Sequence, residues 1–103
     1  MEIIEINKSL IPYDFNIALD GELFNFRVDY NNTGGFFTIE LTKDGETLCA
    51  GEPIIYGRTL FADVRNSKFP NVNIKAYDPS GTYNAVTREN LCENVLLVVE
   101  ARG

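Results

Sequence analysis

The sequence contains no histidine. This absence removes the commonest general base at neutral pH and the commonest transition-metal ligand, and it excludes a nucleophile–histidine pair. Cysteine is also scarce: Cys49 and Cys92 have no further ligands at a recognisable spacing, although a structural zinc site needs about four. We therefore expect no nucleophilic catalytic site, no metal and no cofactor.

Two cysteines are too few for the disulfide framework that small secreted domains normally carry. The sequence opens with Met1 followed by Glu2-Ile3-Ile4-Glu5-Ile6, which has acids where a signal peptide has bases. No apolar run approaches the ~20 residues that a membrane span requires. We expect a protein made in the cytoplasm, with both thiols reduced.

Basic residues are few, with nine Lys and Arg against fifteen Asp and Glu and a net charge of −6. Nucleic-acid binding requires clustered cations on the phosphate backbone, and the only local pair here is Arg65 with Lys68. The same acidity disfavours an anionic membrane surface. We expect neither nucleic acid nor membrane as a partner.

The acidic residues are the remaining source of catalytic groups, because some hydrolases use two carboxylates. Asp20, Asp44 and Asp78 stand at predicted turns, where an Asp carboxylate caps its own backbone. A catalytic acid needs burial to shift its pKa, and these positions are predicted to be wet. We expect turn formers and solvated faces, and therefore no catalytic residues and no enzyme.

What the sequence does contain is alternation of apolar and polar residues from Asp14 to Ala50. Period-two alternation interrupted by Asp-Gly pairs is the strongest short-range signal for β-hairpins. It predicts an antiparallel meander. Its strands are 15–19, 24–30, 37–42 and 47–50, and its turns are 20–21, 31–35 and 44–45.

The flanking segments are less regular. Residues 2–6 are β-prone and form either an edge strand or an arm that pairs with a neighbouring subunit. After a turn at 51–53, residues 54–61 are β-rich with an interruption at Gly57, which suggests a bulge or a close backbone approach. The rest is predicted as a loop at 63–71, a strand at 72–77, a turn at 78–81, one helical turn at 87–91 capped by Thr87, and a last strand at 95–100.

The last predicted strand is an unbroken apolar run, although a strand with one wet face should alternate. It is therefore either central between two layers or covered by a partner. The sequence has seven or eight short strands, a turn signal every eight to twelve residues and no helix of normal length. This pattern predicts an all-β fold, a small antiparallel β-sandwich or partly closed β-barrel, in one domain over residues 1–103.

Partner-binding residues are predicted at both ends of the sequence and around Gly57. The tyrosines near turns, Tyr13, Tyr56, Tyr77 and Tyr83, are expected to pack their rings on the core and leave their hydroxyls in water. The exception is the Tyr56 segment. The predicted partner-binding set is Ile3, Ile4, Ile6, Tyr56, Gly57, Arg58, Leu97 and Val99.

The order of several segments carries a family resemblance. These segments are Ile11-Pro12-Tyr13, the 19–24 and 28–31 stretches, 37–41, the 43–45 turn, 51–57, 78–81, 87–91 and the apolar last strand. Together they resemble the small baseplate plug proteins of contractile-tailed phages and of related phage-tail-like bacteriocins. The resemblance covers about residues 11–99, is most specific at 56–57 and 87–91, and leaves the first ten residues outside it.

The resemblance implies a non-enzymatic structural subunit in the baseplate of a virion or phage-tail-like particle, synthesised in the cytoplasm of a bacterial host. It would lie at the hub near the tail axis and contact hub, tail tube and spike proteins in several copies. The residues themselves leave two alternatives open. One is a β-sandwich module that binds a carbohydrate or another ligand through exposed tyrosines and turn aspartates, with or without calcium, and the other is a small hydrolase with paired acids.

Overall fold

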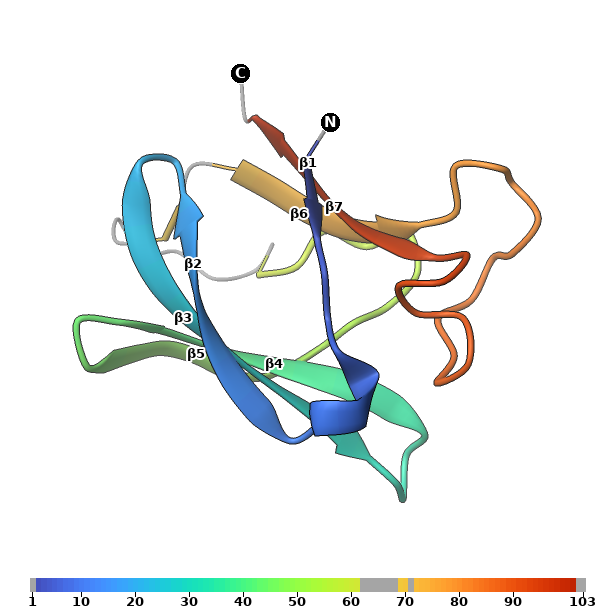
Figure 1. Ribbon diagram of the computed structural model, residues 1–103, viewed down its shortest axis with the longest axis horizontal. Helices are drawn as coiled ribbons and strands as arrows, with labels where there is room; N and C mark the ends of the chain where they lie inside the picture. Colours follow the sequence, from blue (N-terminus) through green and yellow to red (C-terminus); the bar gives the residue numbers. More distant parts are fainter. Residues whose placement is uncertain (1, 62–68, 71, 102–103) are drawn as a thin grey trace.

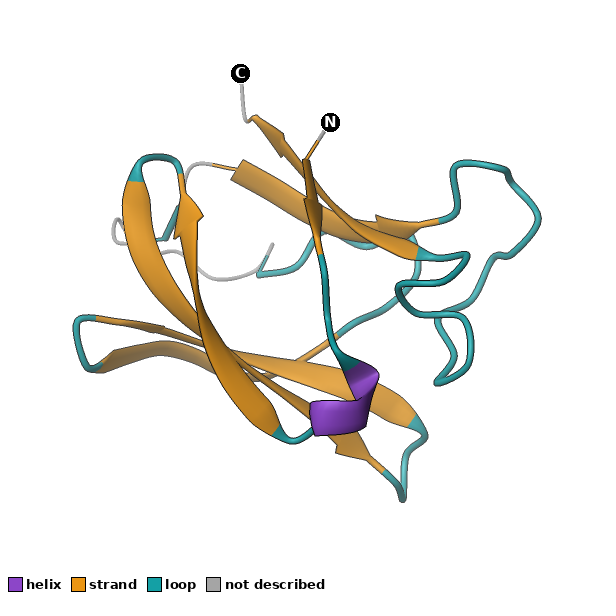
Figure 2. Cartoon of the chain, in the orientation of Figure 1, coloured by secondary structure: helices purple, strands orange, loops and turns teal. Residues whose placement is uncertain are grey.

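The computed structural model describes residues 2–61, 69–70 and 72–101. Within these residues the chain forms strands and a single 3-10 turn, so the all-β prediction is confirmed (Figure 2). The elements in order are β1 (Glu2–Ile4), η1 (Lys8–Leu10), β2 (Tyr13–Leu19), β3 (Glu22–Asn31), β4 (Phe36–Lys43), β5 (Glu46–Pro53), β6 (Val72–Tyr77) and β7 (Leu96–Ala101).

The strands form two antiparallel sheets that face each other across one core (Figure 1). One sheet has the order β2-β3-β4-β5, and the other has the order β1-β7-β6. Apolar side chains from both sheets join a single buried cluster that includes Ile4, Phe26, Ile39 and Leu97. The result is an open β-sandwich and not a closed barrel.

The four-stranded sheet is the predicted meander. Its two tight turns have positive φ at both central residues, with 53° and 77° at Asp20-Gly21 and 50° and 79° at Asp44-Gly45. These angles belong to the primed turns whose twist matches that of the flanking strands, which is why Asp-Gly predicts them. The first two hairpins keep an unbroken register, from Tyr13↔Val28 to Leu19↔Glu22 and from Asn25↔Thr42 to Asn31↔Phe36.

The predicted turn at 51–53 is wrong. β5 continues through this segment and pairs Glu52 with Ile39 and Pro53 with Thr38. The register shifts between Ile39 and Leu41, and Gly51 adopts a φ of 71°. A bulge therefore absorbs the glycine without ending the strand.

The last strand, β7, is central in its sheet, as one of the two predicted alternatives required. β1 pairs along one side of it and β6 along the other. Leu97 and Val98 are fully buried, which explains why the run does not alternate. The pairing of β1 with β7 also confirms the edge-strand interpretation of the first residues, with Glu2 opposite Val99 and Ile4 opposite Leu97.

The predicted β-rich stretch at 54–61 is not a regular strand. It runs beside β6 and touches it through two isolated bridges, Tyr56↔Ala76 and Thr59↔Lys75. A backbone turn at Gly57, with a φ of 73° and a bond from Arg58 N to Ile55 O, separates the two bridges. The predicted loop at 63–71, with Arg65 and Lys68, lies outside the described residues except for Phe69 and Pro70.

Asp78 closes the turn after β6. Its carboxylate accepts hydrogen bonds from Ser80 N and Oγ at 2.9 and 2.7 Å, from Thr82 N at 3.0 Å and from Tyr83 N at 2.9 Å. The turn prediction is confirmed, but the expected wet environment is wrong, because the residue is 5% exposed. The Ser80 hydroxyl and the three backbone N–H groups lower the pKa of this carboxyl below its ordinary value.

We expect Asp78→Asn to lower the melting temperature by several degrees at pH 7, because an amide offers one acceptor and one donor to a site built from donors only. A depressed pKa means that the stability contributed by the carboxylate is present above pH ~3.9 and is lost as the pH falls through the folded-state pKa. The melting difference between wild type and variant should therefore shrink below pH ~4 in a thermal series. Asp44→Asn, at an exposed turn position that suits Asn, is the control and should change little. A constant difference from pH 7 to pH 2 would contradict this role.

Candidate functional site

Half of the predicted partner-binding set lies in the protein's own core. Ile4, Ile6, Leu97 and Val99 are 3, 5, 0 and 6% exposed. The first and last strands pair with each other, and Ile6, two residues after β1, joins the same core cluster. These four side chains are too deeply buried to contact a partner in this fold, so a partner surface must be formed by other residues.

The Tyr56 segment is bound along the open side of β6. Gly57 N donates to Ala76 O at 2.8 Å, and the Tyr56 hydroxyl accepts from Asp78 N at 3.1 Å. The Tyr13 hydroxyl likewise accepts from Asn7 N at 2.8 Å. Both tyrosine hydroxyls therefore have a backbone partner within the protein. Of the predicted set, Gly57, Arg58 and Ile3 remain exposed, with Ile3 at 42%.

The edges of the two sheets differ in how well their backbones are protected against an added strand. β1 has only three residues, and β6 is bridged by the Tyr56 segment. β5 is bulged and carries Gly51 and Pro53. β2 has seven residues in unbroken register, and among the described residues it pairs only with β3. Short strands, bulges and proline are the usual protections of edge strands, so β2 is the least protected edge.

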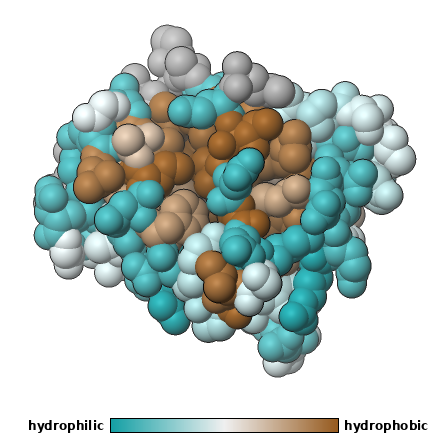
Figure 3. Space-filling view, viewed as in Figure 1, coloured by the Kyte–Doolittle hydropathy of each residue, from teal (hydrophilic) through white to brown (hydrophobic). Residues whose placement is uncertain are grey.

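β2 is also where the sandwich is open. Its core-facing side chains Tyr13, Phe15 and Ile17 are only half buried, although they pack against the core. Their cross-strand partners on β3 are fully buried: Val28, Phe26 and Phe24. The rings of Tyr13 and Phe15 stack at 5.5 Å and extend the apolar surface along the strand. Figure 3 shows apolar surface that extends from β2 towards β1.

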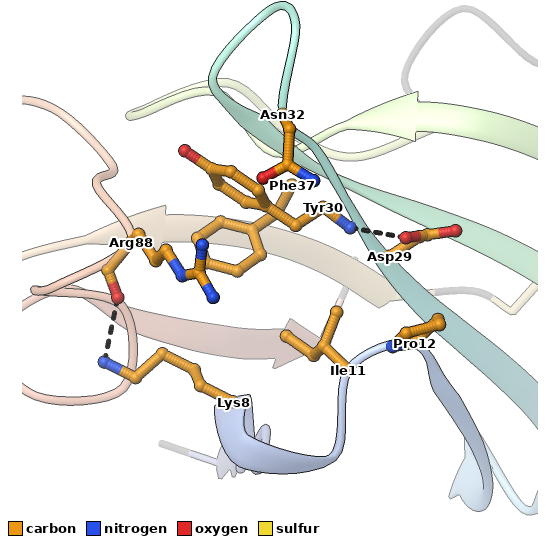
Figure 4. A pocket seen from close by; sticks show the side chains of 8 residues that line it. All are labelled: Lys8, Ile11, Pro12, Asp29, Tyr30, Asn32, Phe37 and Arg88. Atoms are coloured by element: carbon orange, nitrogen blue, oxygen red, sulfur yellow. Dashed lines mark hydrogen bonds between the residues drawn. The ribbon is translucent and has the colours of Figure 1, made fainter.

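A pocket of about 130 Å³ adjoins the start of β2 (Figure 4). It lies where the segment that joins η1 to β2 meets the β3–β4 hairpin and the long β6–β7 connection. Its lining residues are Lys8, Ile11, Pro12, Asp29, Tyr30, Asn32, Phe37 and Arg88. Segments that are distant in sequence therefore build one recess beside the least protected edge strand.

One wall of this pocket is aromatic. Tyr30 and Phe37 stand directly opposite each other on β3 and β4, with ring centroids 4.8 Å apart and planes at 70°. The Arg88 guanidinium lies over the Tyr30 ring, with its Cζ atom 5.2 Å from the centroid. This distance is within the range of a cation–π contact, which fixes the guanidinium over the aromatic surface.

Arg88 is carried by a tightly bonded turn. Thr87 N donates to Asn90 Oδ1 at 2.8 Å, and Asn90 N donates to Thr87 Oγ1 at 3.1 Å. Asn90 is 5% exposed, and its side-chain amide also donates to Ala85 O at 2.9 Å. The predicted helical turn capped by Thr87 is therefore present, with Leu91 N bonded to Thr87 O at 3.2 Å.

Lys8 ties the first ten residues to this turn. Its Nζ donates to Arg88 O and Glu89 O, both at 3.1 Å, and lies 3.9 Å from Glu93 Oε1. The short helix that carries Lys8 is capped by Asn7, whose Oδ1 accepts from Ser9 N at 3.1 Å. The N-terminal segment is thus a structural part of the pocket.

The described residues contain no group of three or more His, Cys, Asp or Glu side chains that could hold a metal ion. Both cysteines are free thiols, and burial raises their pKa, which disfavours the reactive thiolate. No helix among these residues is long and apolar enough to cross a membrane.

We expect chelators to leave the melting temperature unchanged. A metal that binds only the folded state raises the melting temperature by mass action, so a chelator would lower the melting temperature only if such a metal were bound. The measurement is a thermal melt with and without EDTA after dialysis. A large drop in melting temperature with EDTA, reversed by added Zn²⁺ or Ca²⁺, would contradict this prediction.

The relation of this protein to known families agrees with the sequence resemblance. No curated protein matches the sequence. The family model described as cyanophage baseplate Pam3 plug gp18 matches residues 1–102. This match confirms the resemblance to baseplate plug proteins and extends it over the first ten residues. The protein therefore belongs to the family of cyanophage baseplate plug proteins.

Proposed function

We propose that this protein plugs or joins the hub, tail tube and spike proteins at the tail axis and catalyses no reaction. Family membership makes it a structural component of a phage baseplate that associates with other baseplate proteins. The observation that carries the finer proposal is the edge of β2, which pairs only with β3 among the described residues and carries half-buried apolar side chains. A surface of this kind suits a subunit that is covered in its assembly.

The docking mode that fits β2 is strand addition. An extended segment of a neighbouring baseplate protein would pair with the free side of β2 and satisfy its outward backbone groups. The same segment would cover Tyr13, Phe15 and Ile17, which β3 covers on one side only. Backbone bonds would supply affinity and the half-buried side chains would supply specificity.

Several copies arranged about the tail axis would each present the same edge to equivalent neighbours. Cyclic symmetry repeats one contact around the axis, so a modest interface is multiplied by the number of copies. In this arrangement Ile3 and Arg58 stay exposed at the surface.

The carbohydrate-binding alternative gains no support from the geometry. The tyrosines proposed for a sugar site have partners within the protein, since the Tyr13 hydroxyl accepts from Asn7 N and the Tyr56 hydroxyl accepts from Asp78 N. Paired catalytic acids gain none either, since the buried carboxylate of Asp78 is occupied by turn donors. The structural role is therefore the one that we retain.

The test is the mass of the purified protein by light scattering, alone and after co-expression with the hub, tube and spike proteins encoded beside it. We expect self-association or a stable stoichiometric complex with at least one of them. A monomer that binds none of the three proteins would overturn the proposed docking role.

A further inference from the structure

We infer that the pocket between Arg88, Tyr30 and Ile11 binds one carboxylate group from a protein. The carboxylate would belong to an Asp or Glu residue or to the carboxyl terminus of a polypeptide. Only its origin in a neighbouring baseplate protein rests on the proposed function. The binding itself follows from the residues that line the pocket (Figure 4).

Arg88 supplies the recognition group. Its guanidinium points into the pocket in Figure 4 and is held there by the Tyr30 ring and the Thr87–Asn90 turn. Among the described residues it forms no ion pair, so its N–H groups can donate hydrogen bonds to a ligand. A planar guanidinium fork matches a carboxylate with two parallel hydrogen bonds, and aromatic neighbours strengthen such a contact by excluding water.

The charges around the pocket favour a single negative charge. Lys8 and Arg88 contribute two positive charges and Asp29 contributes one negative charge. Glu93, 3.9 Å from Lys8, offsets part of the Lys8 charge. The net charge of −6 on the whole protein also repels polyanions at a distance. A carboxylate fits this balance better than a phosphate dianion or a nucleic-acid backbone.

The size and position of the pocket indicate that the carboxylate belongs to a polypeptide. The volume of about 130 Å³ is well below the ~300–1,000 Å³ of pockets that hold drug-sized ligands. It has room for a carboxylate and its methylene stem, which would contact the apolar side chains of Ile11 and Phe37. Pro12 lines the pocket and directly precedes Tyr13, the first residue of β2. A segment paired with β2 would therefore bring its own side chains or its end past the pocket.

The test is an NMR titration of the isotope-labelled full-length protein, followed at the Arg88 side-chain N–H and the Tyr30 ring. The side-chain probes are N-acetyl-aspartate amide and N-acetyl-glutamate amide, the carboxyl-terminal probe is N-acetyl-alanine, and the neutral control is N-acetyl-asparagine amide. Inorganic phosphate is a separate arm. We expect saturable shifts with the carboxylates, with a Kd on the order of millimolar, and none with the neutral amide. The tighter carboxylate identifies an acidic residue or a carboxyl terminus as the source.

Variants assign the effect to the pocket. Arg88→Gln should weaken carboxylate binding by about tenfold or more. Arg88→Lys keeps the charge but lacks the planar guanidinium, so its affinity for the carboxylate should lie between those of the wild type and Arg88→Gln. Arg27→Gln removes the same charge from an exposed position on β3 and should leave binding unchanged. Equal shifts with the neutral amide, tighter binding of phosphate, or unchanged binding in a folded Arg88→Gln would each overturn the inference. Because the titration uses this protein alone, its failure is distinct from a failure to join the baseplate proteins.

Discussion

Leu97→Lys should fail to fold at 25 °C and be lost from the soluble fraction. Leu97 is 0% exposed in the central strand, directly between Ile4 and Ala76 of the flanking strands. Removing a buried leucine costs about 2–5 kcal/mol, and an uncompensated buried charge costs a further ~3–5 kcal/mol. The sum reaches the ~5–15 kcal/mol total stability of a typical domain. The measurement is the amount of variant in the soluble fraction after expression, followed by far-UV circular dichroism and one-dimensional NMR of any protein recovered from it.

The control for this substitution is the same change at an exposed leucine. Leu23 is 61% exposed at the start of β3, so Leu23→Lys should shift stability by no more than about 0.5 kcal/mol. Leu97→Ala adds no charge and should fold with reduced stability. A soluble Leu97→Lys that still enters the baseplate would show that β7 is not the core strand of this fold.

The meander was predictable from sequence because its determinants are local. Alternation fixes which face of each strand is apolar, and Asp20-Gly21 and Asp44-Gly45 specify primed turns through their own backbone preferences. The cover on both faces of the last strand also followed from its residues, because an unbroken apolar run has no wet face. The sequence left open whether a central position or a partner supplies that cover, and the sheet order shows the central position.

The irregular segments were not predictable because the strand that each one pairs with, and not its own composition, decides its structure. Gly51 and Pro53 have the composition of a turn, yet β4 pairs with Glu52 and Pro53 and keeps β5 extended. Residues 54–61 have the composition of a strand, yet Gly57 turns the backbone and leaves two isolated bridges to β6. The composition of a segment suggests a turn or a strand, but its pairing with a neighbouring strand determines which one forms.

In the candidate site, too, contacts between distant segments could not be predicted from local sequence patterns. Ile4 and Leu97 were predicted partner residues because apolar ends suggest docking, but β1 and β7 pair with each other and bury them. β2 and β3 alternate alike in sequence, and only the sheet order shows that β2 is an edge. The pocket was missed because it joins Lys8, Tyr30 and Arg88 from three distant segments, which no local pattern relates.

Ile17→Lys should give a folded protein that no longer enters the baseplate. Ile17 is half buried on the core-facing side of β2, so a lysine stem can lie along the apolar surface while its ammonium reaches water, at a cost of about 1–2 kcal/mol. An added strand would trap that ammonium, and an inward charge on an edge strand is how natural sheets prevent such pairing. Asn16→Lys adds the same charge on the opposite, exposed face of β2 and should still be incorporated. The measurements are thermal melts of both variants and their content in purified particles. Normal incorporation of a folded Ile17→Lys would remove β2 as the docking edge and direct attention to Ile3 and Arg58.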